Sequence, residues 1–261
     1  MFAIVLAGGK GERLRPLTSD RPKCMVPLLG TPILEYQVEW LRESGVTDIV
    51  VACGYLHEKI EEYFEDGSRW GVRIRYSVET EPLGRGGALK LAYRQVPASE
   101  PFVIGTNGDN VNTQPLGPVL RQHQRSGAVA TLLLVQLRSP YGIVQQRGRR
   151  IVGFREKPLL PHWLSAGVYV LNREFFADLP EVGDHEDGLF PRLAAEGRLY
   201  GFRSRSYWKA IDTVKDLNEA AAQLSAQAPR ADGGNGQGSA HGSLAAQDTT
   251  RHRPRVLAPL S

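Results

Sequence analysis

Residues 2–18 read FAIVLAGGKGERLRPLT, an apolar run that leads into three glycines and two arginines. A short apolar run that ends at glycine is typical of a buried strand in a parallel sheet. The chain leaving such a strand enters the crevice where open α/β sheets bind ligands. Because glycines let the backbone approach a phosphate and leave N–H groups free to bond it, this stretch predicts a phosphate site where the strand ends.

The loop does not match two familiar glycine-rich phosphate motifs. A dinucleotide-binding fingerprint needs G-x-G-x-x-G at the start of a helix, but no third glycine follows Gly11 at that spacing and Pro16 interrupts an early helix. A Walker loop, G-x-x-x-x-G-K-[ST], is absent too. Arg13, Arg15 and Lys23 add positive charge nearby. A tight turn with solvated arginines is the alternative that the loop alone leaves open.

The loop and the basic element RPKCMVPL at residues 21–28 together resemble the signature of the sugar-1-phosphate nucleotidylyltransferases, the NDP-sugar pyrophosphorylases. In that family L-A-G-G-x-G-T/E-R-L-x-P-L-T is followed by P-K-x-x-x-P. The resemblance covers residues 1–224 and is nearest in pattern to the short guanylyltransferases of mannose and heptose 1-phosphates. Five later segments resemble family elements in the same order: residues 79–89, 141–144, 154–158, 165–169 and 208–213.

Strands and helices are predicted to alternate through the first half of the chain. A helix is expected between Thr31 and Gly45, with Thr31 as its N-cap and Pro32 as its first residue. Strict alternation in residues 72–78 predicts a half-exposed or edge strand. This βαβ rhythm predicts an α/β fold with a doubly wound, mainly parallel, Rossmann-like sheet that binds a nucleotide. The other expected elements are strands at residues 2–7, 48–53 and 102–106 and helices at residues 57–65 and 87–95.

The second half of the chain is less regular. Residues 143–154 predict a β-hairpin with the basic turn RGRR, and the resemblance implies that this hairpin is a sugar-binding insertion. Residues 228–261 are rich in Gly, Ala, Ser, Pro and Arg without a period, which predicts a disordered tail. The nucleotidyltransferase domain is therefore expected at residues 1–227. Further strands are expected at residues 131–137, 168–171 and 207–212, and a closing helix at residues 214–227.

Composition narrows the class of protein. The 261 residues suffice for one large α/β domain, and no run approaches the roughly 20 apolar residues of a membrane span. Two cysteines, Cys24 and Cys53, suit a reducing compartment, so a cytoplasmic protein is expected, and both thiols are expected to pack in the core. The net charge of +4 comes without a basic and aromatic stripe, which disfavours nucleic acid as a partner. A homo-oligomer is left open.

Asp109 follows the predicted strand at residues 102–106, on the same edge of the sheet as the glycine loop. A carboxylate beside phosphates requires a divalent cation between them, and Mg²⁺ is held by one or two carboxylates together with phosphate oxygens. The sequence therefore predicts Mg²⁺ as the cofactor. The alternative for Asn107-Gly108-Asp109 in isolation is an ordinary turn.

The resemblance implies attack by a sugar 1-phosphate on the α-phosphorus of an NTP, with release of pyrophosphate and an NDP-sugar. The attacking phosphate has a second pKa of about 6 and is largely ionised, so no general base is needed. Arg13, Lys23 and Asp109 are the expected catalytic residues. The expected nucleotide-binding residues are Leu6, Ala7, Gly8, Gly9, Gly11, Glu12, Glu79, Pro82, Gly84, Asn107 and Gly108. The expected sugar-phosphate-binding residues are Tyr141, Gly142, Glu156, Lys157, Ser165 and Ala166.

Three positions bear on specificity and on departures from the family pattern. The usual second metal carboxylate is Ala210 here, and Asp212 stands two residues further on, about 6.5 Å away on the same face if the segment is a strand. Asp212 is therefore a candidate metal ligand; the alternative is a catalytically impaired homologue that binds nucleotide or NDP-sugar and regulates a partner. Arg85 replaces a usual threonine. Glu79 can accept from guanine N1–H and N2–H₂, which favours GTP and leaves the other bases open.

Overall fold

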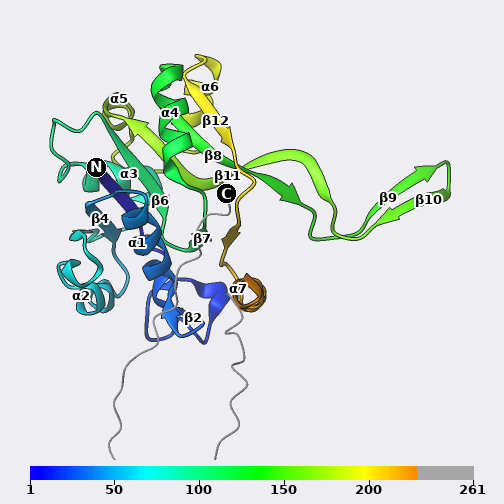
Figure 1. The fold of residues 1–261 in the computed structure, drawn as a ribbon, viewed down its shortest axis with the longest axis horizontal. Helices are drawn as coiled ribbons and strands as arrows, with labels where there is room; N and C mark the ends of the chain where they lie inside the picture. Colours follow the sequence, from blue (N-terminus) through cyan, green and yellow to red (C-terminus); the bar gives the residue numbers. More distant parts are fainter. Residues whose placement is uncertain (228–261) are drawn as a thin grey trace, which may run out of the picture.

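The computed structural model describes residues 1–227, and its centre is a seven-stranded sheet (Figure 1). The strand order is β12-β8-β11-β6-β1-β4-β5, and neighbours pair in parallel except on the two sides of β11. The predicted α/β fold with a mainly parallel sheet is confirmed. The strands are β1 (Phe2–Leu6), β4 (Asp48–Cys53), β5 (Arg73–Val78), β6 (Phe102–Asn107), β8 (Ala130–Arg138), β11 (Leu159–Asn172) and β12 (Leu199–Arg203).

Burial along the strands follows from their place in the sheet. All six residues of β4 are buried, as expected for an inner parallel strand covered on both faces. In β5, exposed Arg73 and Arg75 alternate with buried Ile74, and this strand forms one edge of the sheet. The edge strand predicted from the alternation is therefore confirmed.

Helices cover both faces of the sheet, as the prediction of a doubly wound fold requires. One apolar cluster joins the sheet to α1, α2 and α4, and the other joins it to α3, α5 and α6. Successive residues of β1 point to opposite faces of the sheet, so Val5 packs in the first cluster and Ile4 in the second. The helices are α1 (Ile33–Glu43), α2 (Glu58–Phe64), α3 (Gly84–Tyr93), α4 (Leu116–Ser126), α5 (Arg173–Ala177), α6 (Leu189–Ala195) and α7 (Val214–Gln227).

A third apolar cluster ties the end of the described chain to its beginning. Ala220 and Leu224 of α7 are buried with Leu14 and Leu28 from the glycine loop and the segment after it. Ile211 belongs to the same cluster, just beyond β13 (Trp208–Ala210), which pairs with β7 (Asn110–Asn112). This cluster brings residues 208–213 against the loop.

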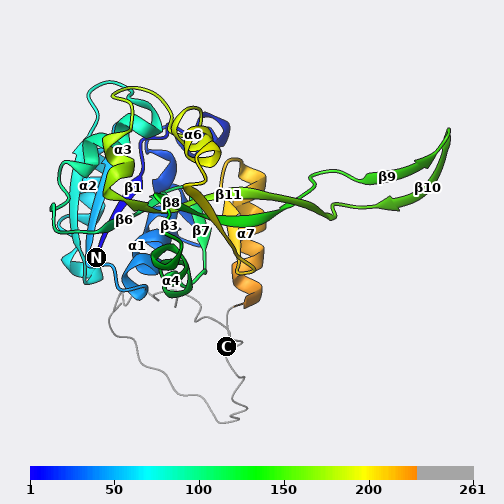
Figure 2. The ribbon, with the colours of Figure 1, turned by 90° about the horizontal axis from the view of Figure 1, so that it is seen from above.

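The predicted hairpin is formed by β9 (Ile143–Arg147) and β10 (Arg150–Arg155). It points away from the body of the molecule in two perpendicular views (Figures 1 and 2). Its apolar side chains Ile151, Val152 and Phe154 are exposed. The hairpin is an extension of β8 and β11 rather than part of the central layers.

Several local predictions differ from the structure. Thr31 and Pro32 are not N-cap and N1: they form β3 (Thr31–Pro32), which pairs with β2 (Pro27–Leu28), and α1 begins at Ile33 with Pro32 as its N-cap. The helix predicted at residues 87–95 begins at Gly84. The strand predicted at residues 207–212 is only three residues long. The elements β12, α4, α5 and α6 were not predicted.

The predicted tail, residues 228–261, lies outside the described residues. Within residues 1–227 no helix is long and apolar enough to cross a membrane.

Candidate active site

The glycine loop that follows β1 closes over Lys23. Gly11 has φ +67°, and a Cβ there would lie 2.9 Å from both Lys23 Cβ and Thr18 Cγ2, so only glycine fits. The hydroxyl of Thr18 donates to the Gly11 carbonyl at 2.8 Å, and the Lys23 N–H donates to the Gly9 carbonyl at 3.1 Å. These contacts hold Gly11, just before the short helix η1 (Glu12–Leu14), against Lys23, the first residue of the short helix η2 (Lys23–Met25).

The turn after β6 lies against the end of β1. The Gly108 N–H donates to the Leu6 carbonyl at 2.8 Å, and a Cβ on Gly108 would lie 3.1 Å from the same oxygen. Since β1 and β6 are parallel neighbours, their carboxyl ends meet at one edge of the sheet. Asp109 is thereby carried next to the glycine loop.

Four charged side chains meet at this edge. Lys23, whose side chain is 10% exposed, donates to Asp109 Oδ2 at 2.5 Å and to Asp212 Oδ1 at 2.6 Å. The Arg13 guanidinium lies 3.0 Å from the same Asp212 oxygen. Burial alone would lower the pKa of Lys23, but the two carboxylates overcome it and the pKa lies above its ordinary value. The site therefore holds a charged ammonium group between two carboxylates.

The strand pairing explains how Asp212 reaches Lys23. Ala210 pairs with Asn110, and the Ile211 N–H donates to the Asp109 carbonyl at 3.0 Å. Ile211 is fully buried in the third apolar cluster, so the residues on either side of it face the opposite way. Ala210 lines a cavity beside Asp109 and Asp212 contacts Lys23, so both positions face the site as predicted. The role of Asp212 as a metal ligand stays a prediction.

The residues at this point fit a magnesium ion. Among residues 1–227 no group of three or more His, Cys, Asp or Glu side chains could hold a metal, but Mg²⁺ needs only one or two carboxylates when phosphates complete its shell. Asp109 and Asp212 each place an oxygen on the same Lys23 nitrogen, so both carboxylates already converge on one cation. This convergence shows that they are arranged to share a positive charge.

A cavity of about 420 Å³ opens beside Asp109. The indole N–H of Trp208 donates to the Ala166 carbonyl at 2.8 Å and closes one wall. Ser165 and Ala166, both predicted to bind the sugar phosphate, line this cavity. The full lining is Arg85, Asn107, Asp109, Asn110, Ser165, Ala166, Gly167, Glu186, Phe190, Trp208 and Ala210.

The other four predicted sugar-phosphate residues lie together at the base of the hairpin arm, outside this cavity. A Cβ on Gly142, next to Tyr141, would lie 3.0 Å from Glu156 Oε2, and Lys157 follows directly. Leu159 pairs with Arg138 and Ser165 with Leu134, so four residue steps of β8, or about 13 Å, separate the base of the hairpin from Ser165. The structure therefore groups the predicted sugar-phosphate residues in two sets rather than one.

Glu79 lies on the opposite side of the glycine loop, directly after β5. One carboxylate oxygen accepts from the Leu83 N–H at 2.9 Å, and the other would lie 3.5 Å from a Cβ on Gly8. Burial raises the pKa of Glu79 above its usual range, and the bond from Leu83 partly offsets this. Gly84 begins α3 at φ +72°. Glu79 and Gly8 are thus brought together, as nucleotide binding by both would require.

Asp184 and Glu186 are among the residues of the cavity region that were not predicted. Asp184 and Glu186 both pair with Arg85, and they come from the segment between α5 and α6, for which the sequence predicted no element. No local periodicity or motif marked that segment, so only the folded chain reveals their place.

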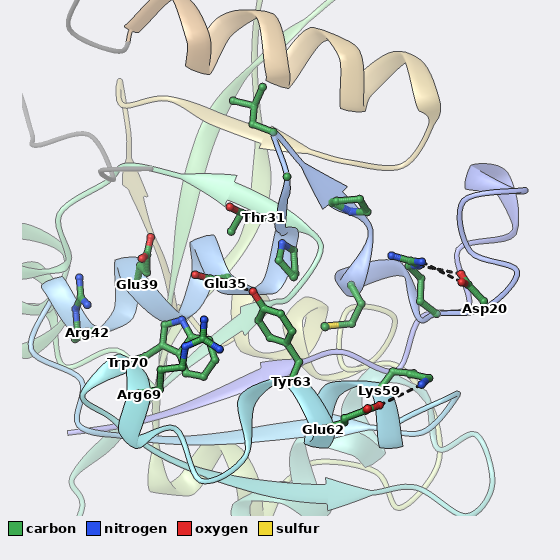
Figure 3. A pocket seen from close by; sticks show the side chains of 16 residues that line it. Asp20, Thr31, Glu35, Glu39, Arg42, Lys59, Glu62, Tyr63, Arg69 and Trp70 are labelled. Carbon is green, nitrogen blue, oxygen red and sulfur yellow. Dashed lines mark hydrogen bonds and ion pairs between the residues drawn. The ribbon is translucent and has the colours of Figure 1, made fainter. Parts of the chain in front are cut away.

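A larger cavity, of about 910 Å³, lies elsewhere, near α1, α2 and η3 (Ser68–Trp70), as Figure 3 shows. Tyr63 and Trp70 line it together with Glu35, and Lys59 pairs with Glu62 at its side. None of the predicted catalytic residues lines this cavity. Asp109 lines the cavity of about 420 Å³ instead, so the smaller cavity is the candidate active site.

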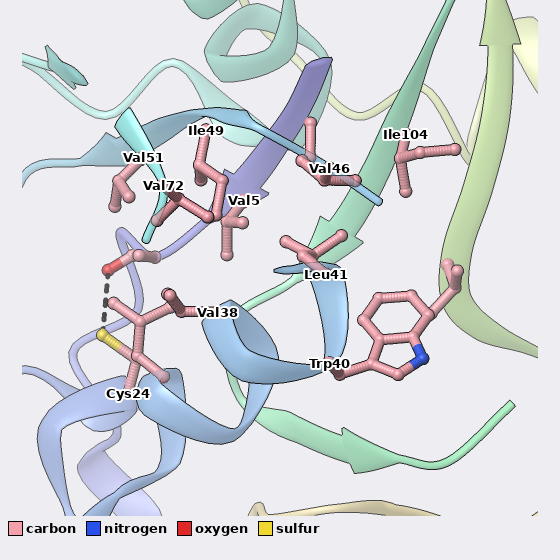
Figure 4. Packing of buried hydrophobic residues seen from close by; sticks show 14 of the residues in the cluster. Val5, Cys24, Val38, Trp40, Leu41, Val46, Ile49, Val51, Val72 and Ile104 are labelled. Carbon is pink, nitrogen blue, oxygen red and sulfur yellow. Dashed lines mark hydrogen bonds between the residues drawn. The ribbon is translucent and has the colours of Figure 1, made fainter. Parts of the chain in front are cut away.

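Cys24, the neighbour of Lys23, is a core residue. Its thiol donates to the Ala7 carbonyl at 3.9 Å, and Figure 4 shows its side chain beside Val38, in the apolar cluster that also contains Val5. Burial raises the pKa of the Cys24 thiol well above its usual range. The packing role predicted for Cys24 agrees with this environment, and Cys53 is likewise buried.

Comparison with known proteins gives a consistent picture. The nucleotidyl transferase family model matches residues 2–227. The D-glycero-α-D-manno-heptose 1-phosphate guanylyltransferase of Aneurinibacillus thermoaerophilus is 35% identical, with 86% of this chain and 98% of that protein covered. The mannose-1-phosphate guanyltransferase of Yarrowia lipolytica is 37% identical, and the match covers 83% of this chain and 62% of that protein. The UTP–glucose-1-phosphate uridylyltransferase of Synechocystis is 34% identical over 84% of this chain and 62% of that protein.

Solved structures share the same fold. A putative glucose-1-phosphate thymidylyltransferase from Bacillus anthracis superposes with a TM-score of 0.70 at 24% identity, covering 85% of this chain and 95% of that one. HddC from Yersinia pseudotuberculosis superposes with a TM-score of 0.69 at 24% identity, covering 85% and 99%. Both structures are 24% identical to this chain and show that the fold is shared.

Proposed function

Because this chain belongs to the nucleotidyl transferase family, we propose that it transfers a guanylyl group from GTP to a sugar 1-phosphate with the help of Mg²⁺. The family and the nucleotidyltransferase activity predicted from the sequence are confirmed by the relatives. The base and the metal are the parts that we propose. The observation that carries the proposal is the convergence of Asp109 and Asp212 on Lys23 beside the glycine loop.

In the proposed reaction an oxygen of the sugar 1-phosphate attacks the α-phosphorus of the NTP. A new P–O bond forms, the bond between the α-phosphorus and the bridging oxygen breaks, and pyrophosphate leaves with the electron pair. No side chain needs to take a proton, since the attacking phosphate is largely ionised near neutral pH. The task of the protein is to bring two polyanions together in line and to neutralise their charge. Arg13 and Lys23 supply that positive charge.

Asp109 and Asp212 would hold the magnesium ion. When bound, the ion supplies positive charge between the carboxylates and the phosphate oxygens. In the structure Lys23 pairs with the same two carboxylates. A magnesium ion bound there would replace the ammonium group as their partner, and the ammonium group would then be free to bind the α-phosphate. The N–H groups of Gly8, Gly9 and Gly11 would bind the remaining phosphate oxygens.

Glu79 supports the choice of GTP. Its carboxylate lies beside Gly8 at the rim of the loop, where a base attached to the bound phosphates would reach it. It can accept from guanine N1–H and N2–H₂, a pair of donors that thymine and uracil do not present. The two guanylyltransferases among the relatives described above are in line with this choice, while the uridylyltransferase keeps UTP as the competing substrate.

A catalytically impaired homologue that binds nucleotide or NDP-sugar is the second candidate function. Ala210 favours it, because a methyl group stands where the family pattern has a metal carboxylate. Pyrophosphate release measured for each NTP against a panel of neutral sugar 1-phosphates separates the two. Turnover with GTP supports the enzyme, whereas nucleotide binding without release under all conditions supports the impaired homologue.

The same assay tests the catalytic residues. Asp109→Asn is expected to reduce turnover by about 10²- to 10³-fold, because the contact acts on charge in the transition state. Asp20→Asn is the matched control, since Asp20 is an exposed aspartate paired with its neighbour Arg21. An Asp109→Asn protein with full activity would contradict the proposed site.

A further inference from the structure

Arg85 is held in place by two carboxylates at the wall of the cavity. Its backbone N–H donates to Asp184 Oδ1 at 2.7 Å, and its guanidinium lies 3.0 Å from Asp184 Oδ2. The other guanidinium nitrogen pairs with Glu186. Because a guanidinium is planar and its donors are fixed in direction, pairing at two points sets its orientation. Arg85 is therefore a fixed group rather than a freely moving side chain.

Glu186 is itself held by a second hydrogen bond. The hydroxyl of Tyr169, which is buried in β11, donates to Glu186 Oε1 at 3.0 Å. The segment that carries Asp184 and Glu186 lies close against α3, because the Gly86 N–H donates to the Gly183 carbonyl at 2.9 Å. A Cβ on Gly86 would lie 2.8 Å from that same oxygen. The close approach of the two backbones fixes the position of Arg85 relative to Glu186.

Arg85 and Glu186 line the same cavity as Asp109. An arginine next to a carboxylate offers donors and an acceptor side by side, which suits two hydroxyl groups of one ring. Phe190 adds an apolar wall to the cavity. A sugar ring in this cavity would therefore contact both charged and apolar groups.

The charges of the cavity disfavour an anionic substituent there. Its lining contains one cation, Arg85, and two carboxylates, Asp109 and Glu186, while Asp184 also pairs with Arg85. Arg85 is thus neutralised by its own partners, and a further carboxylate or phosphate on the ligand would meet an excess of negative charge. Neutral hydroxyls meet no such repulsion.

We propose that Arg85 and Glu186 determine which sugar 1-phosphate the chain accepts. They select a neutral sugar with free hydroxyls on the part of the ring that contacts Arg85 and Glu186, and they reject deoxy sugars and uronic acids at that position. This inference rests on the proposed function, since it names the substrate class of the same site.

The test compares kcat/KM for a neutral hexose 1-phosphate, its deoxy analogues and the corresponding uronic acid 1-phosphate, each with GTP and Mg²⁺. The wild-type chain is expected to prefer the hydroxylated sugar by about 10- to 100-fold, because a deoxy analogue loses a hydrogen bond to a charged group. Arg85→Thr is expected to bring this preference to within about threefold while KM for GTP stays within about twofold.

Two further variants separate recognition from a purely structural role. Arg85→Lys keeps the charge but cannot bridge both carboxylates, so it is expected to lose most of the preference as well. Glu186→Gln removes a negative charge and is expected to raise the relative activity on the uronic acid 1-phosphate by about 10-fold. Arg94→Thr, at the end of α3 and paired with Glu181 on the surface, is the matched control.

The outcomes are distinguishable. If the Arg85 variants lower the melting temperature but keep the wild-type preference, Arg85 only holds the fold and the inference is overturned. If the wild-type chain releases no pyrophosphate with any NTP and sugar, the proposed function fails instead. Calorimetric binding of the same sugar 1-phosphates to the wild type, Arg85→Thr and Glu186→Gln then decides the inference, with equal affinities in all three overturning it.

Discussion

Replacing Asp212 by asparagine tests whether this residue takes the place of the carboxylate missing at Ala210. Asp212 Oδ1 lies 2.6 Å from Lys23 Nζ and 3.0 Å from the Arg13 guanidinium, and Asp109 Oδ2 lies 2.5 Å from the same Lys23 nitrogen. An amide keeps the size of the side chain and removes its charge. The substitution therefore isolates the charge that a metal ion would use.

The expected magnitude follows from these contacts. A hydrogen bond or ligand contact to a charged group is worth about 1.5–3 kcal/mol, which corresponds to roughly 10- to 150-fold in an equilibrium constant. We therefore expect Asp212→Asn to raise the half-saturating Mg²⁺ concentration by about that factor. The assay is pyrophosphate release titrated with Mg²⁺ at saturating GTP and sugar 1-phosphate.

Two controls accompany this experiment. Asp20→Asn, on the surface, should leave the Mg²⁺ titration unchanged. The double variant Ala210→Asp with Asp212→Ala returns the carboxylate to the family position, where it lines the cavity beside Asp109, and should recover part of the lost Mg²⁺ affinity. A titration for Asp212→Asn that matches the wild type within about twofold would show that Asp212 only pairs with Lys23 and Arg13 and does not bind the metal ion.

Three further predictions concern the loop, the core and the base. Gly11→Ala should lower the free energy of unfolding by about 2–4 kcal/mol, since it combines a left-handed backbone with close contacts to Lys23, while Gly30→Ala, with open space around it, should lower it by about 1 kcal/mol in urea titrations. Burial lowers the pKa of His185 to about 4, so the unfolded chain binds the proton more readily and stability is lost as pH falls from about 6.5 towards 4. Between pH 7.5 and 5 this contributes a loss of about 2 kcal/mol, which His185→Leu should abolish. Glu79→Gln should lower kcat/KM for GTP by about 10- to 100-fold and leave that for UTP within about threefold, as measured by pyrophosphate release.

Each of these predictions has a result that contradicts it. Equal losses in stability for Gly11→Ala and Gly30→Ala would show that Lys23 and Thr18 move aside without difficulty. An unchanged acid dependence in His185→Leu would assign that dependence to other groups, even though neither ring nitrogen of His185 has a hydrogen-bond partner within residues 1–227. Parallel losses with GTP and UTP for Glu79→Gln would remove Glu79 from base selection.

Features encoded over a few neighbouring residues were predictable. The apolar run of β1, the glycine loop and the turn at Asp109 are local signals, because burial on both faces and close backbone approach restrict residue choice at consecutive positions. The edge strand β5 and the hairpin arm were predictable for the same reason, since strict alternation and a short turn are read within one segment. Family membership followed from the same local motifs.

The position of Asp212 relative to Lys23 depends on contacts far apart in the sequence. The two residues are 189 positions apart and meet because Ile211 is buried in a cluster with α7 and the loop after β1. No periodicity specifies which distant apolar segments join one cluster. The sequence could place Ala210 and Asp212 on one face, but only the closed fold decided that Asp212 reaches the ammonium group.

The class of fold, the phosphate-binding loop and the family could therefore be predicted from sequence, because each of these depends on local backbone and packing requirements. Two features of the site became visible only in the folded chain: Asp109 and Asp212 share Lys23, and Arg85 is fixed by Asp184 and Glu186. The physical reason is that ion pairs form where the core brings distant segments together, and the core is a property of the whole chain.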